Sequence, residues 1–347
     1  MNHNFDILSN QLKDVIKFFE SLPLPKFKAK QTVNWIHNRG SLSYEEMTDL
    51  SKDDRAKLNQ IAPFYIPPII KTDRSKDGTI KFLLKLADNN LVETVLIPEA
   101  RRSTVCLSSQ IGCKLKCKFC VTALDGLIRN LTSSEIIGSF LAIKRATLDK
   151  PITNIVFMGM GEPLDNYENL IRALKILTDP DSMLIGGRKI TVSTSGISDK
   201  IEQLASDFPK IKLAVSINAV SNGKRSKLMP INKKFPIESI FHALRKWEPP
   251  KGRKLTFEYL LIKDLTDSLE DAAKLDQLTK SIRSVINLIP YNSSPYIDLQ
   301  PSSKDQIKRF QEELIKRNRI AIIRESRGKD INAACGLLKK HAQLSES

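Results

Sequence analysis

The 347-residue sequence lacks any apolar run long enough to cross a bilayer, and its first residues lack a basic stretch followed by an apolar one. These absences predict a soluble, cytoplasmic protein with no membrane segment and no secretory signal. Its five cysteines are an odd number, which favours reduced cytosolic thiols over a disulfide framework. With 41% hydrophobic residues, the chain can build one large core and a small additional domain.

Positive charge dominates the composition. The 55 lysines and arginines outnumber the 39 acidic residues, and the formal net charge is +16. Such a balance favours a polyanionic partner, because neutralising phosphates releases bound counterions. A basic composition also has a simpler explanation in solubility, so charge alone leaves nucleic-acid binding open.

Three cysteines lie close together in the pattern C-x3-C-x2-C, at Cys113, Cys117 and Cys120. Thiolates are soft ligands of iron, and iron–sulfur clusters are commonly held by four of them. Three nearby thiolates leave one iron open, and an open coordination position is typical of a catalytic metal site. Phe119 adds an apolar group that can shield a cluster from water. A structural zinc site with its fourth ligand elsewhere is the alternative, although paired C-x2-C motifs are missing.

The first hundred residues divide into helical and extended patterns. Apolar residues recur at three- and four-residue intervals in segments 11–22, 28–39 and 43–62, which predicts helices. Two extended runs, 79–86 and 91–97, flank a polar turn and predict a β-hairpin. We therefore expect a small helical module followed by a β linker.

From residue 103 onwards, extended and helical segments alternate. This alternation predicts an α/β fold with a parallel sheet and right-handed crossovers. The expected strands are 104–108, 154–158, 189–193, 212–217, 254–262 and 285–290, and the expected helices lie near 133–147, 166–178, 198–206, 236–246, 267–280 and 304–318.

Small and polar residues follow the carboxyl ends of these strands, where barrel-like α/β proteins perform their chemistry. The cysteine loop follows the first strand, and the other strand ends carry Gly161, Glu162, Ser193, Ser216, Asn218 and Asn292. Each residue alone is explained by turn formation or loop capping. Their joint placement predicts one binding site at the rim of the sheet.

The cysteine run, with an aromatic residue before its last cysteine, resembles the radical S-adenosylmethionine (SAM) superfamily. Further segments resemble the RlmN-type RNA adenine C2 methyltransferases and occur in that family's order between about residues 90 and 340. These segments are 92–94, 106–120, 158–163, 193–196, 229–233, 287–292 and 333–336.

The resemblance implies a partial (β/α)6 radical SAM barrel. It divides the chain into an N-terminal helical, RNA-binding module (1–70), a β-hairpin linker (71–98), the radical SAM core (99–332) and a C-terminal segment (333–347). It also implies a [4Fe-4S] cluster on Cys113, Cys117 and Cys120. SAM is then held by Gly161, Glu162, Ser193, Ser216, Asn218 and Asn292. Asn218 departs from the histidine usual in the family, which matters only if the imidazole contacts SAM.

Cys335 is the residue that first accepts a methyl group, according to the resemblance. Its small neighbours leave the sulfur accessible, and Arg327 and Lys329 favour a thiolate, although a lone cysteine also packs as a small apolar residue. A short extended run at 320–324 precedes it. The resemblance further implies that Cys106 pairs transiently with Cys335 in a disulfide bond, and that Glu93 accepts a proton.

The implied activity is methylation of C2 of adenosine in the peptidyl-transferase region of 23S rRNA and of adenosine 37 in tRNAs, using two SAM molecules and an S-methylcysteine intermediate. The C2 carbon is electrophilic, so a radical route is required. The expected partners are these RNAs and a low-potential electron donor such as flavodoxin or ferredoxin, and we expect a monomer. Two alternatives are a related C8 methyltransferase of the antibiotic-resistance type and a non-catalytic RNA-binding protein with a structural metal.

Several basic residues lie near the expected rim or in the helical module and are candidates for holding the RNA backbone, although charged runs are more often solvated faces. The target adenine must be unstacked, because its C2 carbon is inaccessible inside a helix. These candidates are Lys26, Lys28, Lys30, Lys114, Lys116, Lys118, Lys224, Arg225, Lys227, Lys233 and Lys234.

Overall fold

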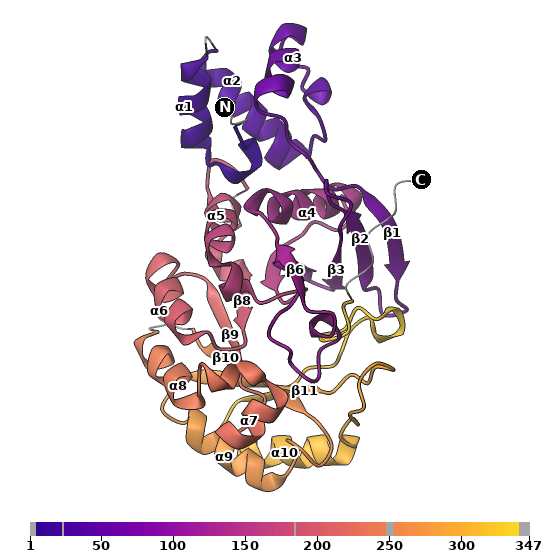
Figure 1. Ribbon diagram of the computed structural model, residues 1–347, viewed down its shortest axis with the longest axis vertical. Helices are drawn as coiled ribbons and strands as arrows, with labels where there is room; N and C mark the ends of the chain where they lie inside the picture. Colours follow the sequence, from indigo (N-terminus) through magenta and orange to yellow (C-terminus); the bar gives the residue numbers. More distant parts are fainter. Residues whose placement is uncertain (1–4, 23, 184, 248–252, 340–347) are drawn as a thin grey trace.

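The computed structural model describes residues 5–22, 24–183, 185–247 and 253–339, and its centre is one ten-stranded sheet. The strand order is β1-β2-β3-β4-β7-β8-β9-β10-β11-β12 (Figure 1). The first four strands, β1 (Ile69–Arg74), β2 (Ile80–Lys85), β3 (Leu91–Glu99) and β4 (Arg102–Cys106), pair antiparallel. Among the described residues, no helix is both long and apolar enough to span a membrane.

Parallel pairing begins at β4 and continues to the far edge of the sheet. The parallel strands after β4 are β7 (Asn154–Phe157), β8 (Ile190–Thr194), β9 (Lys212–Ser216), β10 (Leu255–Leu261), β11 (Ser284–Pro290) and β12 (Ala321–Ile323). The predicted α/β class is therefore confirmed. The short run at 320–324 forms β12, a seventh parallel strand beside β11.

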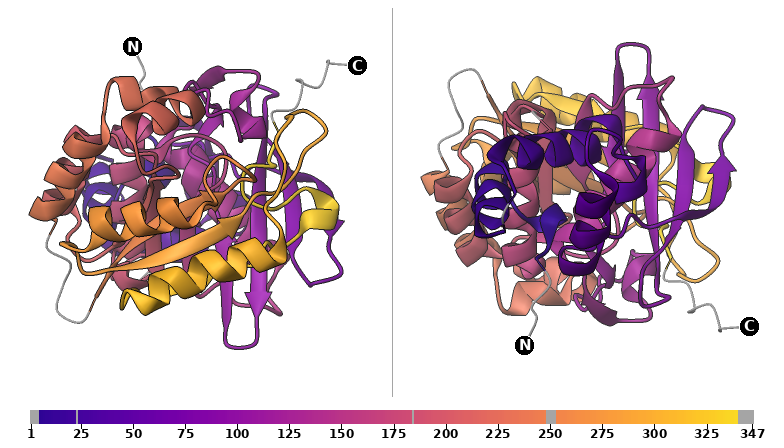
Figure 2. Two further views of the ribbon diagram at one scale, coloured as in Figure 1. Left: turned by 90° about the horizontal axis from the view of Figure 1, so that it is seen from below. Right: turned by 90° about the horizontal axis from the view of Figure 1, so that it is seen from above.

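Helices connect the parallel strands and lie on the outer side of the curved sheet (Figure 2). They are α4 (Ser133–Ala146), α5 (Tyr167–Thr178), α6 (Ser198–Asp207), α7 (Asn222–Leu228), α8 (Ile237–Lys246), α9 (Leu269–Thr279) and α10 (Lys304–Lys316). The start of α4 is fixed by a capping box, in which Thr132 and Glu135 bond to each other's backbone N–H. All of these helices except α7 bury apolar residues against the strands, which forms the main core.

The N-terminal module contains α1 (Leu12–Ser21), α2 (Lys26–Asn34), a π-helical turn (Trp35–Arg39) and α3 (Lys52–Ile61), with short 3-10 turns at Ile7–Ser9 and Tyr44–Glu46. The predicted helix over 43–62 is interrupted. The Ser51 side chain accepts a hydrogen bond from the Asp54 N–H and caps α3, so the helix begins there.

The module is attached to the barrel through buried polar contacts with α4 and with the segment after α5. Lys144 donates to the His37 carbonyl at 2.7 Å, and Arg145 donates to the Gly40 carbonyl at 2.9 Å. His37 Nδ1 also contacts the Ser182 hydroxyl. Burial, and secondarily Lys144, lower the pKa of His37 to about 3, so this histidine is neutral near pH 7.

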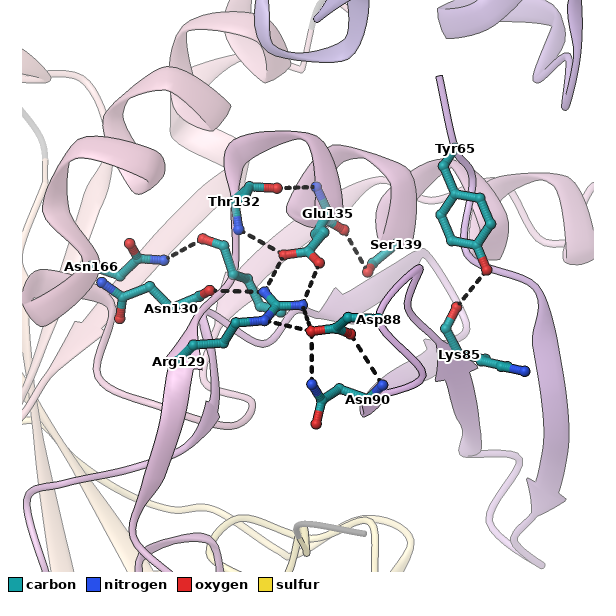
Figure 3. A network of polar contacts seen from close by, with 11 residues as sticks. Tyr65, Lys85, Asp88, Asn90, Arg129, Asn130, Thr132, Glu135, Ser139 and Asn166 are labelled. Carbon is teal, nitrogen blue, oxygen red and sulfur yellow. Dashed lines mark hydrogen bonds and ion pairs between the residues drawn. The ribbon is translucent and has the colours of Figure 1, made fainter. Parts of the chain in front are cut away.

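A two-stranded hairpin, β5 (Gln110–Gly112) and β6 (Leu127–Asn130), encloses the cysteine loop and was not predicted from the sequence. Arg129 on β6 bridges two carboxylates, at 2.7 Å from both Asp88 in the β2–β3 turn and Glu135 in α4 (Figure 3). Strand β1 was also missed, because its charged, largely exposed pattern is that of an edge strand.

Candidate active site

A cavity of about 260 Å³ opens at the carboxyl ends of the parallel strands. It brings together ten of the twelve residues that the sequence singled out, which come from segments far apart in the chain. These ten are Cys113, Cys117, Cys120, Gly161, Glu162, Ser193, Ser216, Asn218, Asn292 and Cys335. Glu93 and Cys106 do not line this cavity.

One wall of the cavity is the cysteine loop between β5 and β6. Its three cysteines form one apolar cluster with Leu115 and Ala123. Lys116 has a φ of 55°, a left-handed conformation that turns the loop between the first two cysteines.

The thiols of this cysteine wall are ligands of the type that an iron–sulfur cluster takes. Within the described ranges, no group of three or more histidine, cysteine or acidic side chains converges to hold a single ion. Cys113, Cys117 and Cys120 nevertheless lie near enough to influence one another's charge, in an apolar surrounding. Burial raises the pKa of Cys113 to about 12, so binding iron must release a proton from this thiol.

Gly159 and Gly161 lack a side chain where another segment of the protein itself packs closely against them. A Cβ on Gly159 would lie 2.6 Å from the Ser108 hydroxyl oxygen. A Cβ on Gly161, whose φ is +98°, would lie 2.5 Å from the Gln110 Cβ. Both glycines therefore pack the turn after β7 against the segment that leads into the cysteine loop.

Glu162 is buried and already accepts several hydrogen bonds. Its Oε2 accepts from the Ser195 N–H at 2.8 Å and from the Ser195 hydroxyl at 2.7 Å, and its Oε1 accepts from the Leu164 N–H at 3.1 Å. Burial raises its pKa, and the bonds from Ser195 oppose that change. The carboxylate is thus held at the cavity wall by the loops after β7 and β8.

Arg225 has a role that the sequence did not reveal. Predicted as an RNA contact, it is instead fully buried, at 0% exposure. Its guanidinium donates to the carbonyl oxygens of Ser195, Ser216 and Ile217 and to Asn232 Oδ1. Burial lowers its pKa to about 10, which leaves it charged at neutral pH. Arg225 therefore holds the loops after β8 and β9 together.

Asn218 also lies at the cavity wall, in a left-handed conformation with a φ of 55°. Its Oδ1 accepts from the Leu260 N–H at 3.1 Å, and its Nδ2 lies 3.5 Å from the Met229 sulfur. Asparagine tolerates this backbone conformation better than most residues. The amide thus links the end of β9 to β10.

A second part of the cavity wall is formed by the segment that carries Cys335. Asn292 Nδ2 donates to the Cys335 carbonyl at 3.2 Å, while the buried Asn292 Oδ1 finds no hydrogen-bond partner among the described residues. The Val121 N–H donates to the Gly336 carbonyl at 2.8 Å, and the Thr122 hydroxyl donates to the Leu338 carbonyl at 2.7 Å. These bonds hold the C-terminal segment against the end of the cysteine loop.

Glu93 anchors the same C-terminal segment. It is 2% exposed, forms an ion pair with Lys81 at 3.0 Å and accepts from the Lys339 N–H at 2.9 Å. Just before β2, Asp77 accepts a hydrogen bond at 2.8 Å from the N–H of Gly328, which lies in the segment leading to Cys335. Strands β2 and β3 are therefore more than a linker, because they position the segment that presents Cys335.

The Cys335 residue is exposed to the cavity, although protein atoms crowd its sulfur. Burial and then Glu258 raise the pKa of Cys335, and Arg324 opposes them only in part. The prediction that neighbouring cations favour the thiolate is therefore wrong for this arrangement.

Cys106 is buried on β4, and its thiol lies near enough to Cys335 for the two charges to interact. Burial, and then Cys335, raise the pKa of Cys106 to about 12. All five cysteines are free thiols in this structure, so the implied disulfide is not formed.

Glu258 on β10 lines the cavity and was not predicted from the sequence. It is 6% exposed and its Oε1 accepts from Asn287 Nδ2 at 3.0 Å. The sequence did contain a sign of this residue, a glutamate within the apolar strand Leu255–Leu261. Burying a charged side chain is costly, so a glutamate in such a strand usually has a structural or functional role.

The basic residues that were predicted to contact RNA are buried, ion-paired or exposed in the structure. Besides the buried Arg225, three of them are ion-paired: Lys28 with Asp54, Lys114 with Asp165 and Lys224 with Asp271. The others are exposed: Lys26, Lys30, Lys116, Lys118, Lys227, Lys233 and Lys234.

Comparisons with known proteins agree with this architecture. Residues 5–63 match the model of the ribosomal RNA large subunit methyltransferase N-terminal domain, and residues 107–275 match the radical SAM superfamily. The chain is 42% identical to the dual-specificity RNA methyltransferase RlmN of Syntrophus aciditrophicus, over 98% of both chains. It is 41% identical to the RlmN of Geotalea uraniireducens, over 96% of both.

A crystal structure of a radical SAM methyltransferase from Sphaerobacter thermophilus superimposes with a TM-score of 0.92 at 38% identity, covering 96% of this chain and 98% of that one. Sequence relatives and fold agree over nearly the whole length. The chain therefore belongs to the RlmN family of radical SAM RNA methyltransferases.

Proposed function

We propose that the protein methylates C2 of adenosine in 23S rRNA, in the peptidyl-transferase region, and C2 of adenosine 37 in tRNAs. The observation that carries the proposal is that Cys113, Cys117, Cys120 and Cys335, which lie far apart in the sequence, line one cavity. The dual-specificity names of the relatives support two classes of RNA substrate.

Each wall has a distinct task in this proposal. The three cysteines would hold a [4Fe-4S] cluster, and Glu162, Ser193, Ser216, Asn218 and Asn292, with the Gly161 turn, would bind SAM. Bound there, the cluster and SAM supply an electron and a carbon radical. The Cys335 sulfur accepts a methyl group by nucleophilic displacement, a covalent step that divides a difficult transfer in two. Phe119, Met229 and Tyr291 line the cavity and help to exclude water.

Release of the RNA is assigned to Cys106, which pairs with Cys335 in a disulfide while Glu93 accepts a proton. Support comes from the charge interaction between the two thiols and from Glu93 lying on β3 beside the C-terminal segment. We further propose that the protein acts as a cytoplasmic monomer and receives electrons from a flavodoxin or ferredoxin. The exposed lysines, together with the 56% exposed Phe27 between Lys26 and Lys28, are candidates for contacts to RNA.

The test is a product analysis. Protein purified without oxygen and reconstituted with iron and sulfide is incubated with SAM, a reductant and 23S rRNA or tRNA, and the digested RNA is analysed by mass spectrometry. We expect 2-methyladenosine with the wild type and none with Cys335→Ala. An 8-methyladenosine product would assign the enzyme to the resistance-type activity instead. A protein that binds zinc and forms no methylated base would be an RNA-binding protein only.

A further inference from the structure

Methylation of Cys335 requires that its thiol lose a proton, and the proposed function does not say which group receives it. Three carboxylates line the cavity: Glu162, Glu258 and Glu325. Glu162 already accepts bonds from Ser195 and Leu164 and lies near Cys113 and Cys117. Glu325 is exposed and is not among the charges that act on the Cys335 thiol.

Glu258 differs from both. It is the strongest charged influence on Cys335, ahead of Arg324 and Cys120. Its Oε1 accepts from Asn287, and its Oε2 accepts no hydrogen bond from any described residue. The side chain is almost fully buried, yet it forms part of the cavity wall. This oxygen is not among the buried atoms that lack a partner, so it is accessible from the cavity, where a reacting group can approach it.

One strand, β11, positions both groups. Asn287 on β11 is the register partner of Glu258 on β10 and donates to its carboxylate. Asn292, just beyond the end of β11, donates to the Cys335 carbonyl. The two asparagines thus hold the carboxylate and the thiol-bearing segment from a common backbone, which fixes their relative position.

We infer that Glu258 accepts the proton of the Cys335 thiol when that sulfur is methylated. The inference rests on the proposed function. The S–H bond breaks and its proton passes to a Glu258 oxygen, directly or through one cavity water. The Cys335 sulfur forms a bond to the methyl carbon of SAM. The bond between that carbon and the SAM sulfur breaks, and S-adenosylhomocysteine leaves with the electron pair.

The surrounding charges suit this transfer. Burial raises the pKa of Glu258, and the opposing effects of Asn287 and Arg324 are smaller. A carboxylate of raised pKa is a better proton acceptor for a thiol than one in water. The groups that act on Cys335 are Glu258 on β10, Arg324 after β12, Cys120 in the cysteine loop and Cys106 on β4. Glu258 is the one carboxylate among them.

The experiment compares wild type, Glu258→Gln and Glu312→Gln as reconstituted full-length proteins. Glutamine can still accept the bond from Asn287, and Glu312 is an exposed residue of α10, so it serves as the matched control. Each protein is incubated with SAM but without RNA, and the peptide that contains Cys335 is weighed over time. We expect Glu258→Gln to methylate Cys335 about a hundredfold more slowly, and to recover as the pH rises. Glu312→Gln should match the wild type.

A second readout excludes simple disruption. Iodoacetamide alkylates the Cys335 thiolate without an enzymatic base, so it reports access and acidity of the sulfur. Removing the Glu258 charge lowers the pKa of Cys335, so alkylation in Glu258→Gln should be as fast as in the wild type or faster. Slow alkylation together with slow methylation would mean that the thiol is displaced, and would overturn the inference.

Normal methylation in Glu258→Gln would overturn the inference alone. A wild-type protein that never methylates Cys335 would overturn both the inference and the proposed function.

Discussion

The two sulfur-bearing walls of the cavity are built in opposite ways. The cysteine wall is contiguous in sequence, with Cys113, Cys117 and Cys120 within one loop between β5 and β6. The Cys335 wall is assembled over long distances, since Thr122 and Leu338 lie 216 positions apart and Glu93 and Lys339 lie 246 apart. The first wall can be recognised from residue spacing, whereas the second depends on hydrogen bonds that only the complete fold supplies.

The sharpest way to separate the walls is to remove one sulfur from each. Cys120→Ala should lose most of its bound iron, because three thiolates are the full protein ligand set of the proposed cluster. Cys335→Ala should keep its iron, and both variants should form no methylated adenosine. Iron analysis after reconstitution provides the measurement. Equal iron loss in both would contradict the division of tasks between the walls.

The loops after β8 and β9, which also line the cavity, are held by Arg225, and Arg225→Met should remove this support. Buried carbonyl oxygens of Ser195, Ser216 and Ile217 lose a donor, so the free energy of unfolding should fall by about 3 kcal/mol. The exposed Lys227→Met in the same helix is the control and should change stability little. Denaturant unfolding tests both. A small effect of Arg225→Met would show that the loops after β8 and β9 keep their structure without Arg225.

Acid should weaken the molecule away from both walls, at the attachment of the N-terminal module. The folded pKa of His37, about 3, lies below the ordinary value of 6.5, so the unfolded chain takes up a proton that the folded chain cannot. Stability is therefore lost as the pH falls below 6.5, by about 2 kcal/mol at pH 5.

Denaturant unfolding at neutral pH and at pH 5 should show that His37→Gln loses less stability on acidification than the wild type. The same substitution at the exposed His242 should leave the pH dependence unchanged. An unaltered dependence in His37→Gln would mean that this histidine is not the acid-sensitive group.

The smallest expected effect tests one bond of the assembled wall. Thr122→Val removes the hydroxyl that donates to the Leu338 carbonyl and should cost about 1 kcal/mol. Amide hydrogen exchange in residues 333–339 should become faster, whereas the cysteine loop and its iron content should be unaffected. Thr191→Val is a suitable control, because the Thr191 hydroxyl bonds to no described residue. Unchanged exchange would show that Val121 and Asn292 suffice to hold the segment.

Sequence patterns predicted what depends on neighbours along the chain. Apolar periodicity located the parallel strands and most helices to within a few residues, and cysteine spacing located the cysteine wall. The polar residues at strand ends meet in one cavity because parallel strands end at the same edge of a sheet.

Partner choice over long distances could not be predicted in the same way. Arg225 lies in the basic run Lys224–Lys227 and resembles a surface residue, yet five acceptors from other segments bury it. Glu93 was assigned by motif alone, and its contacts with Lys81 and Lys339 follow from the register of β2 and β3 and the path of the C-terminal segment. Such contacts depend on how distant segments are arranged in space, which residue types alone do not specify.

The hydrogen bond from Thr122 to Leu338 also bears on the order in which the site forms during synthesis. Synthesis proceeds from the N-terminus, and these two residues lie 216 positions apart. The three clustered cysteines therefore leave the ribosome long before the segment that covers them has been made. Until that segment docks, the cysteine loop lacks its hydrogen bonds to Gly336 and Leu338, so this edge of the cavity is completed last.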